Sequence, residues 1–126
     1  MEARYRSEAG LPALGEGWFS ETHLAHLFAE ALPGVEVVRE ARLDWLVGQR
    51  LDIYIPSLAL AIEYQGIQHY EPIGLFGGEV GLARRQAMDA RRKEACIRAG
   101  VRLVEWRYDE PISKDVVAAR LRGANV

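Results

Sequence analysis

The feature that most constrains this chain is a pair of short apolar runs, residues 50–56 and 60–66, each with one carboxylate where an apolar residue is expected. Both runs alternate and are rich in Ile, Leu and Tyr. Because Pro56 and Ser57 interrupt them, the two runs predict a tight antiparallel hairpin.

A two-residue turn at Ser57 and Leu58 fixes the register of this hairpin and places Asp52 opposite Glu63. The apolar pairs it predicts are Ile55 with Leu60, Tyr54 with Ala61, and Ile53 with Ile62. Opposed side chains lie roughly 4.5 to 5.5 Å apart between Cβ atoms, so the two like charges repel. A divalent cation between them would remove that cost. The alternative is a solvent-facing sheet surface, but the apolar residues between the acids make that face half apolar and favour the metal site.

The composition, with 49% hydrophobic and 27% charged residues, is that of an ordinary globular protein. The length of 126 residues predicts a single domain, 1–126. No apolar run approaches the roughly 20 residues that cross a membrane, residues 1–4 lack the apolar core of a signal peptide, and the single Cys96 has no internal disulfide partner. We therefore expect a cytoplasmic protein with no membrane partner.

The rest of the chain predicts an α/β (α+β) fold. An irregular lead-in (1–19) precedes a helix (21–32), a short strand (35–38), the hairpin, a glycine-rich stretch, a long helix (81–99), a strand (101–106) and a terminal helix (111–121). The strand after the long helix is expected to return alongside the hairpin. This order predicts a mixed four- to five-stranded sheet flanked by helices.

The pattern Asp52, ten intervening residues and Glu63-Tyr64-Gln65 resembles the active-site motif of the PD-(D/E)xK nuclease superfamily, which has the restriction-endonuclease-like fold. With Gly66, His69 and the following helix, it looks like the branch near the very-short-patch-repair endonucleases. The resemblance covers roughly residues 18 to 107. It implies a metal-dependent endonuclease of DNA, with RNA not excluded.

Carried over by position, the resemblance implies that Asp52, Glu63 and the backbone carbonyl of Tyr64 bind Mg²⁺, for which Mn²⁺ can substitute. Gln65 stands where most members have Lys. It can orient a water molecule by hydrogen bonding but cannot supply a positive charge. His69 resembles the histidine that this branch places after the motif, and such a side chain could move a proton to or from the reacting oxygens.

Two further acids match positions that the family uses for metal binding, and each has an alternative. Glu21 matches an inward acid on the first helix, yet it also favours the positive end of the helix dipole. Asp89 matches an acid on the helix after the motif, yet it could simply pair with Arg85 or Lys93 at helical spacing. A zinc site at His23, His26 and Glu30 is disfavoured because a fourth ligand is lacking.

The basic charge is concentrated late in the chain. Residues 1–83 contain 5 Lys or Arg and 12 Asp or Glu, whereas residues 84–107 contain 8 and 3. Repeats every seven residues place Arg84, Arg91 and Arg98 on one stripe of the long helix. With Arg92 and Lys93 beside it, this stripe predicts a surface for a phosphate backbone, although a solvated helix face is the alternative.

The predicted function is metal-dependent hydrolysis of DNA phosphodiester bonds. The alternative is a catalytically weak or inactive nuclease-fold module that binds nucleic acid or a partner protein, which Gln65 and the net charge of -2 favour. A third hypothesis is a structural metal in a protein that acts on a small nucleotide or a protein partner. A homodimer and an additional domain outside this chain both stay open.

Overall fold

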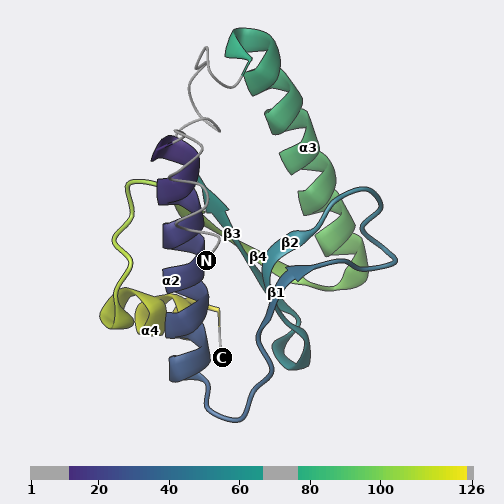
Figure 1. Cartoon of the computed structure of the whole chain (residues 1–126). Coiled ribbons are helices and arrows are strands. Elements are labelled where there is room, and N and C mark those ends of the chain that lie inside the picture. Colours follow the sequence, from purple (N-terminus) through teal and green to yellow (C-terminus); the bar gives the residue numbers. More distant parts are fainter. Residues whose placement is uncertain (1–11, 67–76, 125–126) are drawn as a thin grey trace. The chain divides into compact units, whose positions relative to one another are not determined.

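The computed structural model describes residues 12–66 and 77–124, with side chains from residue 19 onward. The element order is α2 (Pro12–Ala31), β1 (Val38–Ala41), β2 (Leu51–Ile55), η1 (Pro56–Leu58), β3 (Leu60–Gln65), α3 (Gly78–Ala99), β4 (Arg102–Arg107) and α4 (Lys114–Gly123). These elements make an α+β fold with one four-stranded mixed sheet (Figure 1). The predicted fold class and element order are confirmed.

The chain divides into two compact units. Unit 1 combines residues 1–35 with residues 111–126, and unit 2 consists of residues 36–110. Unit 2 contains the whole sheet and α3, so it contains both acids of the hairpin. The prediction of a single domain stays a prediction.

The sheet of unit 2 has the strand order β1-β2-β3-β4, antiparallel except for the parallel pair β3 and β4. The paired residues of the hairpin are Ile55 with Leu60, Tyr54 with Ala61, and Ile53 with Ile62, as predicted. A backbone hydrogen bond of 3.0 Å from Ala59 N to the Pro56 carbonyl closes the turn, and Ala59 has a left-handed φ of 49°. The return of the last strand beside the hairpin is also confirmed.

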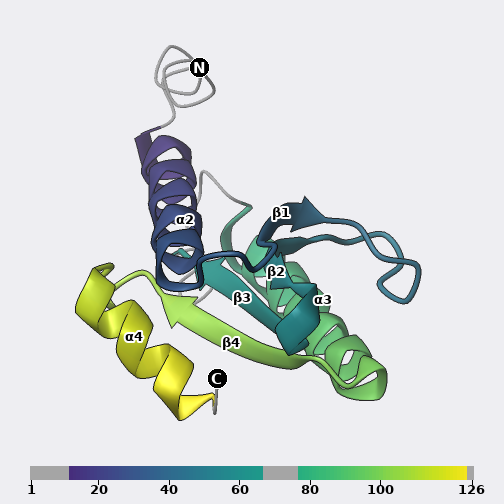
Figure 2. The same ribbon diagram turned by 90° about the horizontal axis from the view of Figure 1, so that it is seen from below.

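Helix α3 covers one face of this sheet (Figure 2). Cys96 and Ala95 of the helix pack with Ala61, Leu103 and Tyr54 of the strands in one apolar cluster. The opposite face is as apolar: Ile53, Ile55, Leu60, Ile62 and Trp106 are all buried. A sheet that is apolar on both faces makes polar side chains within it exceptional.

In unit 1, α2 and α4 pack against each other. Their buried residues are Leu24, Leu27 and Phe28 of α2, and Val117 and Leu121 of α4. Ser113 begins α4 by accepting a hydrogen bond of 3.3 Å from Val116 N at its side chain.

The predicted lead-in was too long, because residues 12–19 already belong to α2. Gly15 and Gly17 led to that error, since glycine lowers helix propensity without forbidding a helix. Residues 1–11 lie outside the described part.

The helices described here include none that is long and apolar enough to cross a membrane.

Candidate active site

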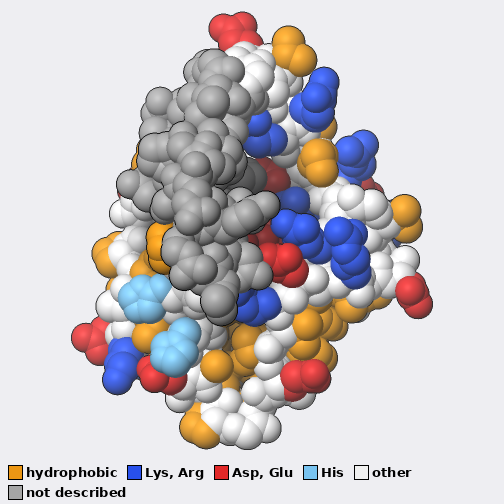
Figure 3. Space-filling view, viewed as in Figure 1, with side chains coloured by type: hydrophobic (Ala, Val, Ile, Leu, Met, Phe, Trp, Pro, Cys, Tyr) orange, Lys and Arg blue, Asp and Glu red, His pale blue; other side chains and the backbone are white. Residues whose placement is uncertain are grey.

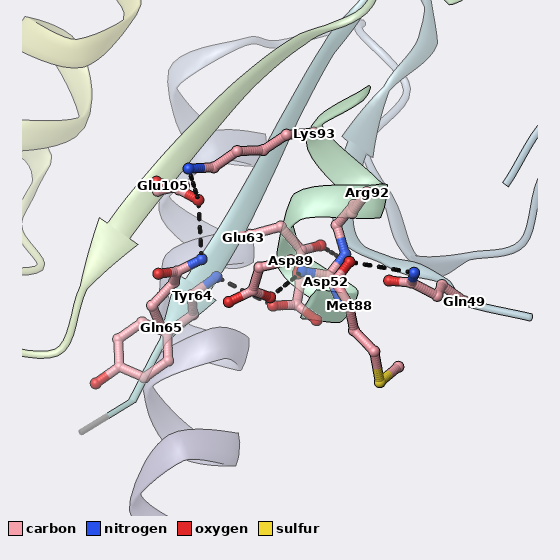
Figure 4. A network of polar contacts seen from close by, with 10 residues as sticks. All are labelled: Gln49, Asp52, Glu63, Tyr64, Gln65, Met88, Asp89, Arg92, Lys93 and Glu105. Atoms are coloured by element: carbon pink, nitrogen blue, oxygen red, sulfur yellow. Dashed lines mark hydrogen bonds and ion pairs between the residues drawn. The ribbon is translucent and has the colours of Figure 1, made fainter. Parts of the chain in front are cut away.

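The two carboxylates of the hairpin lie where the pairing of β2 with β3 ends. The last paired residues are Ile53 and Ile62, and the next residues outward are Asp52 and Glu63. The Asp52 backbone N–H donates to Glu63 Oε2 at 2.6 Å, and the Tyr64 backbone N–H donates to Asp52 Oδ2 at 3.0 Å. Each acid therefore binds the backbone of the neighbouring strand, which holds both carboxylates at fixed positions between the strands (Figure 4).

The Glu63 side chain is buried, with the residue only 5% exposed, and it has a cationic partner from α3. Arg92 Nη1 lies 3.4 Å from Glu63 Oε1, and the Arg92 side chain is 12% exposed. A buried carboxylate is costly unless it is paired and hydrogen-bonded. The guanidinium of Arg92 and the Asp52 N–H meet this requirement, each at a different oxygen of the carboxylate.

Asp89 holds the same guanidinium from the helix side. Its Oδ1 accepts from Arg92 Nη1 at 2.7 Å, three residues away on α3. Burial alone lowers the pKa of Arg92, but the carboxylates of Glu63 and Asp89, with a contribution from Asp52, more than offset this and raise it. Arg92 is therefore a permanent cation within a group of three acids.

A second polar group lies two residues further along β3, where Gln65 is buried. Gln65 Nε2 donates to Glu105 Oε2 at 3.1 Å, and Lys93 Nζ lies 3.3 Å from the same oxygen. The Gln65 amide is thereby tied to a carboxylate that a lysine neutralises. Lys93 is thus linked to Gln65 through the Glu105 carboxylate, which both side chains contact.

Glu105 is a further acid of the site, which the sequence did not predict. In the parallel register of β3 with β4, Glu105 is the partner of Glu63. Asp52, Glu63 and Glu105 consequently form a row across three neighbouring strands on the face that α3 covers. An acid within the alternating strand after the long helix could have pointed to Glu105. Placing it beside Glu63, however, requires the register between strands that are far apart in the sequence.

The structure places the other predicted site residues as follows. Tyr64 follows Glu63 on β3, and its N–H binds Asp52. Glu21 lies on α2 in unit 1, so its metal role stays a prediction. His69 lies outside the described residues. Asp89 pairs at helical spacing with Arg92, and its pairing with Arg85 or Lys93 stays a prediction.

The predicted nucleic-acid surface divides into two groups. Arg84, Arg91 and Arg98 are exposed on α3. Arg92 and Lys93 instead contact the acids, and Lys93 lies about 200° around the helix from Arg91. Figure 3 shows Lys and Arg side chains gathered over α3 on the face viewed. The exposed stripe therefore consists of three arginines.

The donor set can be tested against the metal that the resemblance implies. Within residues 12–66 and 77–124, no three His, Cys, Asp or Glu side chains form a group arranged to hold a metal ion. Carboxylate oxygens are nevertheless the donors that Mg²⁺ prefers, and the Glu63 carboxylate already holds a cation, the Arg92 guanidinium. Asp52 and Glu63 thus fit a divalent cation in their chemistry, while the protein's own cation lies against one of them.

Comparison with known proteins gives one relative. Uncharacterized protein 094L of Frog virus 3 (isolate Goorha) is 43% identical over 60 residues, which cover 46% of this chain and 39% of the viral protein. The matched part of the chain thus spans about two fifths of that relative's length. No known family pattern matches the chain, and no solved structure is similar to it. The assignment of function therefore depends on the geometry of the site.

Proposed function

We propose that the chain is a metal-dependent endonuclease that hydrolyses phosphodiester bonds of DNA. The observation that carries the proposal is the pair of carboxylates, Asp52 and Glu63, fixed by reciprocal bonds to neighbouring strands of an apolar sheet. Two acids in such surroundings cost stability unless they bind a cation. Such a pair of acids, despite its cost in stability, is of use to a protein when the cation that it binds has a function.

In the proposed reaction, water adds to phosphorus, the bond to the leaving oxygen breaks, and that oxygen receives a proton. Asp52, Glu63 and the Tyr64 carbonyl would hold Mg²⁺, which when bound lowers the pKa of a water molecule and offsets phosphoryl charge. Gln65 would orient the attacking water through its amide. His69 would transfer the proton at the leaving oxygen.

The proposed substrate class rests on the exposed arginines of α3. The exposed residues Arg84, Arg91 and Arg98 recur every seven residues on α3, about 10.5 Å apart along the axis. Such a row suits a phosphate backbone, which gives affinity without reading bases. We therefore propose binding to DNA with little sequence preference from this surface.

The test is strand cleavage of supercoiled plasmid in Mg²⁺ or Mn²⁺. We expect nicked or linear product with the wild type, none after chelation by EDTA, and none with Asp52→Ala. Asp44→Ala, which removes an exposed acid from the loop before β2, is the matched control and should cleave normally. Cleavage by Asp52→Ala at the wild-type rate would rule out the mechanism.

The arrangement around Arg92 and Gln65 specifically favours a second candidate, a nuclease-fold module that binds DNA or a partner protein without cutting. Arg92 already pairs with Glu63, and the Gln65 amide is bound to Glu105. A gel-shift assay without divalent cation separates the two. Binding of duplex DNA by a protein that cleaves no plasmid, RNA or free nucleotide in Mn²⁺ would favour the module.

A further inference from the structure

The guanidinium of Arg92 lies in an unusual position, because this cation from α3 contacts Glu63, a candidate metal ligand. Its Nη1 is 3.4 Å from Glu63 Oε1, and only 12% of the Arg92 side chain is exposed. A divalent cation on the same carboxylate would lie within a few ångströms of this positive charge. Two cations that close repel strongly, most of all where water is scarce.

Arg92 has a second partner that does not depend on the strands. Asp89 Oδ1 lies 2.7 Å from the same nitrogen, closer than Glu63, and belongs to the same helix. Rotation of the Arg92 side chain could therefore break the contact with Glu63 while the contact with Asp89 persists. The charge of the guanidinium would stay compensated throughout.

We propose that Arg92 is a resident counter-ion of this site, and that a divalent cation binds Asp52 and Glu63 only when the guanidinium leaves Glu63 and remains on Asp89. This inference rests on the proposed metal site and adds its regulation. Without the cation, Arg92 compensates the buried Glu63 carboxylate and places positive charge near the half-buried Asp52. With the cation, the released guanidinium becomes available to a substrate phosphate, since guanidinium groups bind phosphate well.

Competition of this kind has a measurable consequence. The apparent affinity for the cation equals the intrinsic affinity multiplied by the fraction of molecules in which Arg92 is away from Glu63. If that fraction is about one tenth, removal of the guanidinium strengthens binding about tenfold. An exposed arginine one residue away, Arg91, offers the matched control because it carries the same charge on the same turn of α3.

The experiment is calorimetric titration with Mn²⁺ of the whole chain, without DNA, for the wild type, Arg92→Gln and Arg91→Gln. We expect Arg92→Gln to bind Mn²⁺ about tenfold more tightly than wild type, Arg91→Gln to bind within about twofold of wild type, and Glu63→Gln in the Arg92→Gln background to abolish binding. Binding by Arg92→Gln alone, with none in the wild type, also supports the proposal.

Mn²⁺ binding by Arg92→Gln that is equal to or weaker than that of wild type would overturn the inference and leave the metal site standing. No Mn²⁺ binding by wild type or by Arg92→Gln would overturn both the inference and the proposed metal site. If Arg92→Gln does not fold, Mg²⁺ titration of the wild type followed by NMR of arginine side chains replaces it, with the Arg92 Nε–H resonance assigned by its absence in Arg92→Lys. A shift of that resonance in step with Mg²⁺ binding supports the displacement, and an unchanged resonance at saturation contradicts it.

Discussion

At the scale of the residue, Arg92 is the side chain on which the stability of the acidic group depends most. Its removal leaves the buried Glu63 without its cationic partner, and breaking a buried pair from one side costs about 3 kcal/mol. We therefore expect Arg92→Gln to lower the free energy of unfolding by about 3 kcal/mol, measured by urea denaturation in the absence of divalent cations. Arg91→Gln, on the exposed side of the helix, should change it by less than about 0.5 kcal/mol. Equal losses in the two variants would show that the pair with Glu63 contributes nothing.

The buried thiol of Cys96 gives a prediction for pH. Burial, reinforced by the Glu63 carboxylate and opposed by Arg92, raises the pKa of Cys96 above its ordinary value of 9.0. The folded protein thus keeps a proton that the unfolded chain loses above pH 9.0, so the contribution of Cys96 to stability is present below that pH and is lost as the pH rises toward the folded-state pKa. We expect the stability deficit of Cys96→Ala relative to wild type to shrink between about pH 8 and about pH 10.5 in urea denaturation. A deficit that stays constant over this range would contradict the pKa shift.

At the scale of the element, the exposed face of α3 gives a prediction for DNA binding. Each arginine that neutralises a phosphate releases counterions, so the loss of one should reduce the slope of log affinity against log salt by about 0.9. We expect Arg84→Gln, Arg91→Gln and Arg98→Gln each to weaken binding of duplex DNA and to reduce that slope, as measured by fluorescence anisotropy from low to moderate salt. Arg122→Gln, an exposed arginine on α4, is the control. A slope unaffected by all three α3 substitutions would remove this face from the interface.

The elements also show which features a sequence can predict. The hairpin register followed from local alternation, because a slip of one residue would turn Ile53 and Ile55 to the wrong face. Helical periodicity grouped Arg92 with the exposed arginines, because it gives the faces of a helix without saying which face meets the sheet. Glu105 was not predicted as a site residue, because its position beside Glu63 depends on the pairing of β4 with β3, two segments about forty residues apart in the sequence. Local structure was therefore predictable, and the partners of the acids were not.

At the scale of the whole molecule, cation binding should appear as stability of the chain. A ligand present at 100 times its dissociation constant adds about 2.7 kcal/mol to the free energy of unfolding. For a chain of 126 residues this corresponds to a rise in Tm of about 10 °C. We expect this rise with Mn²⁺ in differential scanning calorimetry of the wild type and no rise in Glu63→Gln. An equal rise in both proteins would place the cation elsewhere on the molecule.

The proposed role of Glu63 in metal-dependent hydrolysis is tested by the rate of plasmid cleavage in Mg²⁺ by wild type and Glu63→Gln, assayed together after circular dichroism has shown both to be folded. Glu94→Gln, an exposed glutamate on α3, serves as the matched control. We expect Mg²⁺-dependent cleavage by the wild type and Glu94→Gln and a loss of rate of about a thousandfold or more in Glu63→Gln. Cleavage by Glu63→Gln at the wild-type rate, or no cleavage by any of the three proteins in Mg²⁺ or Mn²⁺, would contradict the proposed role.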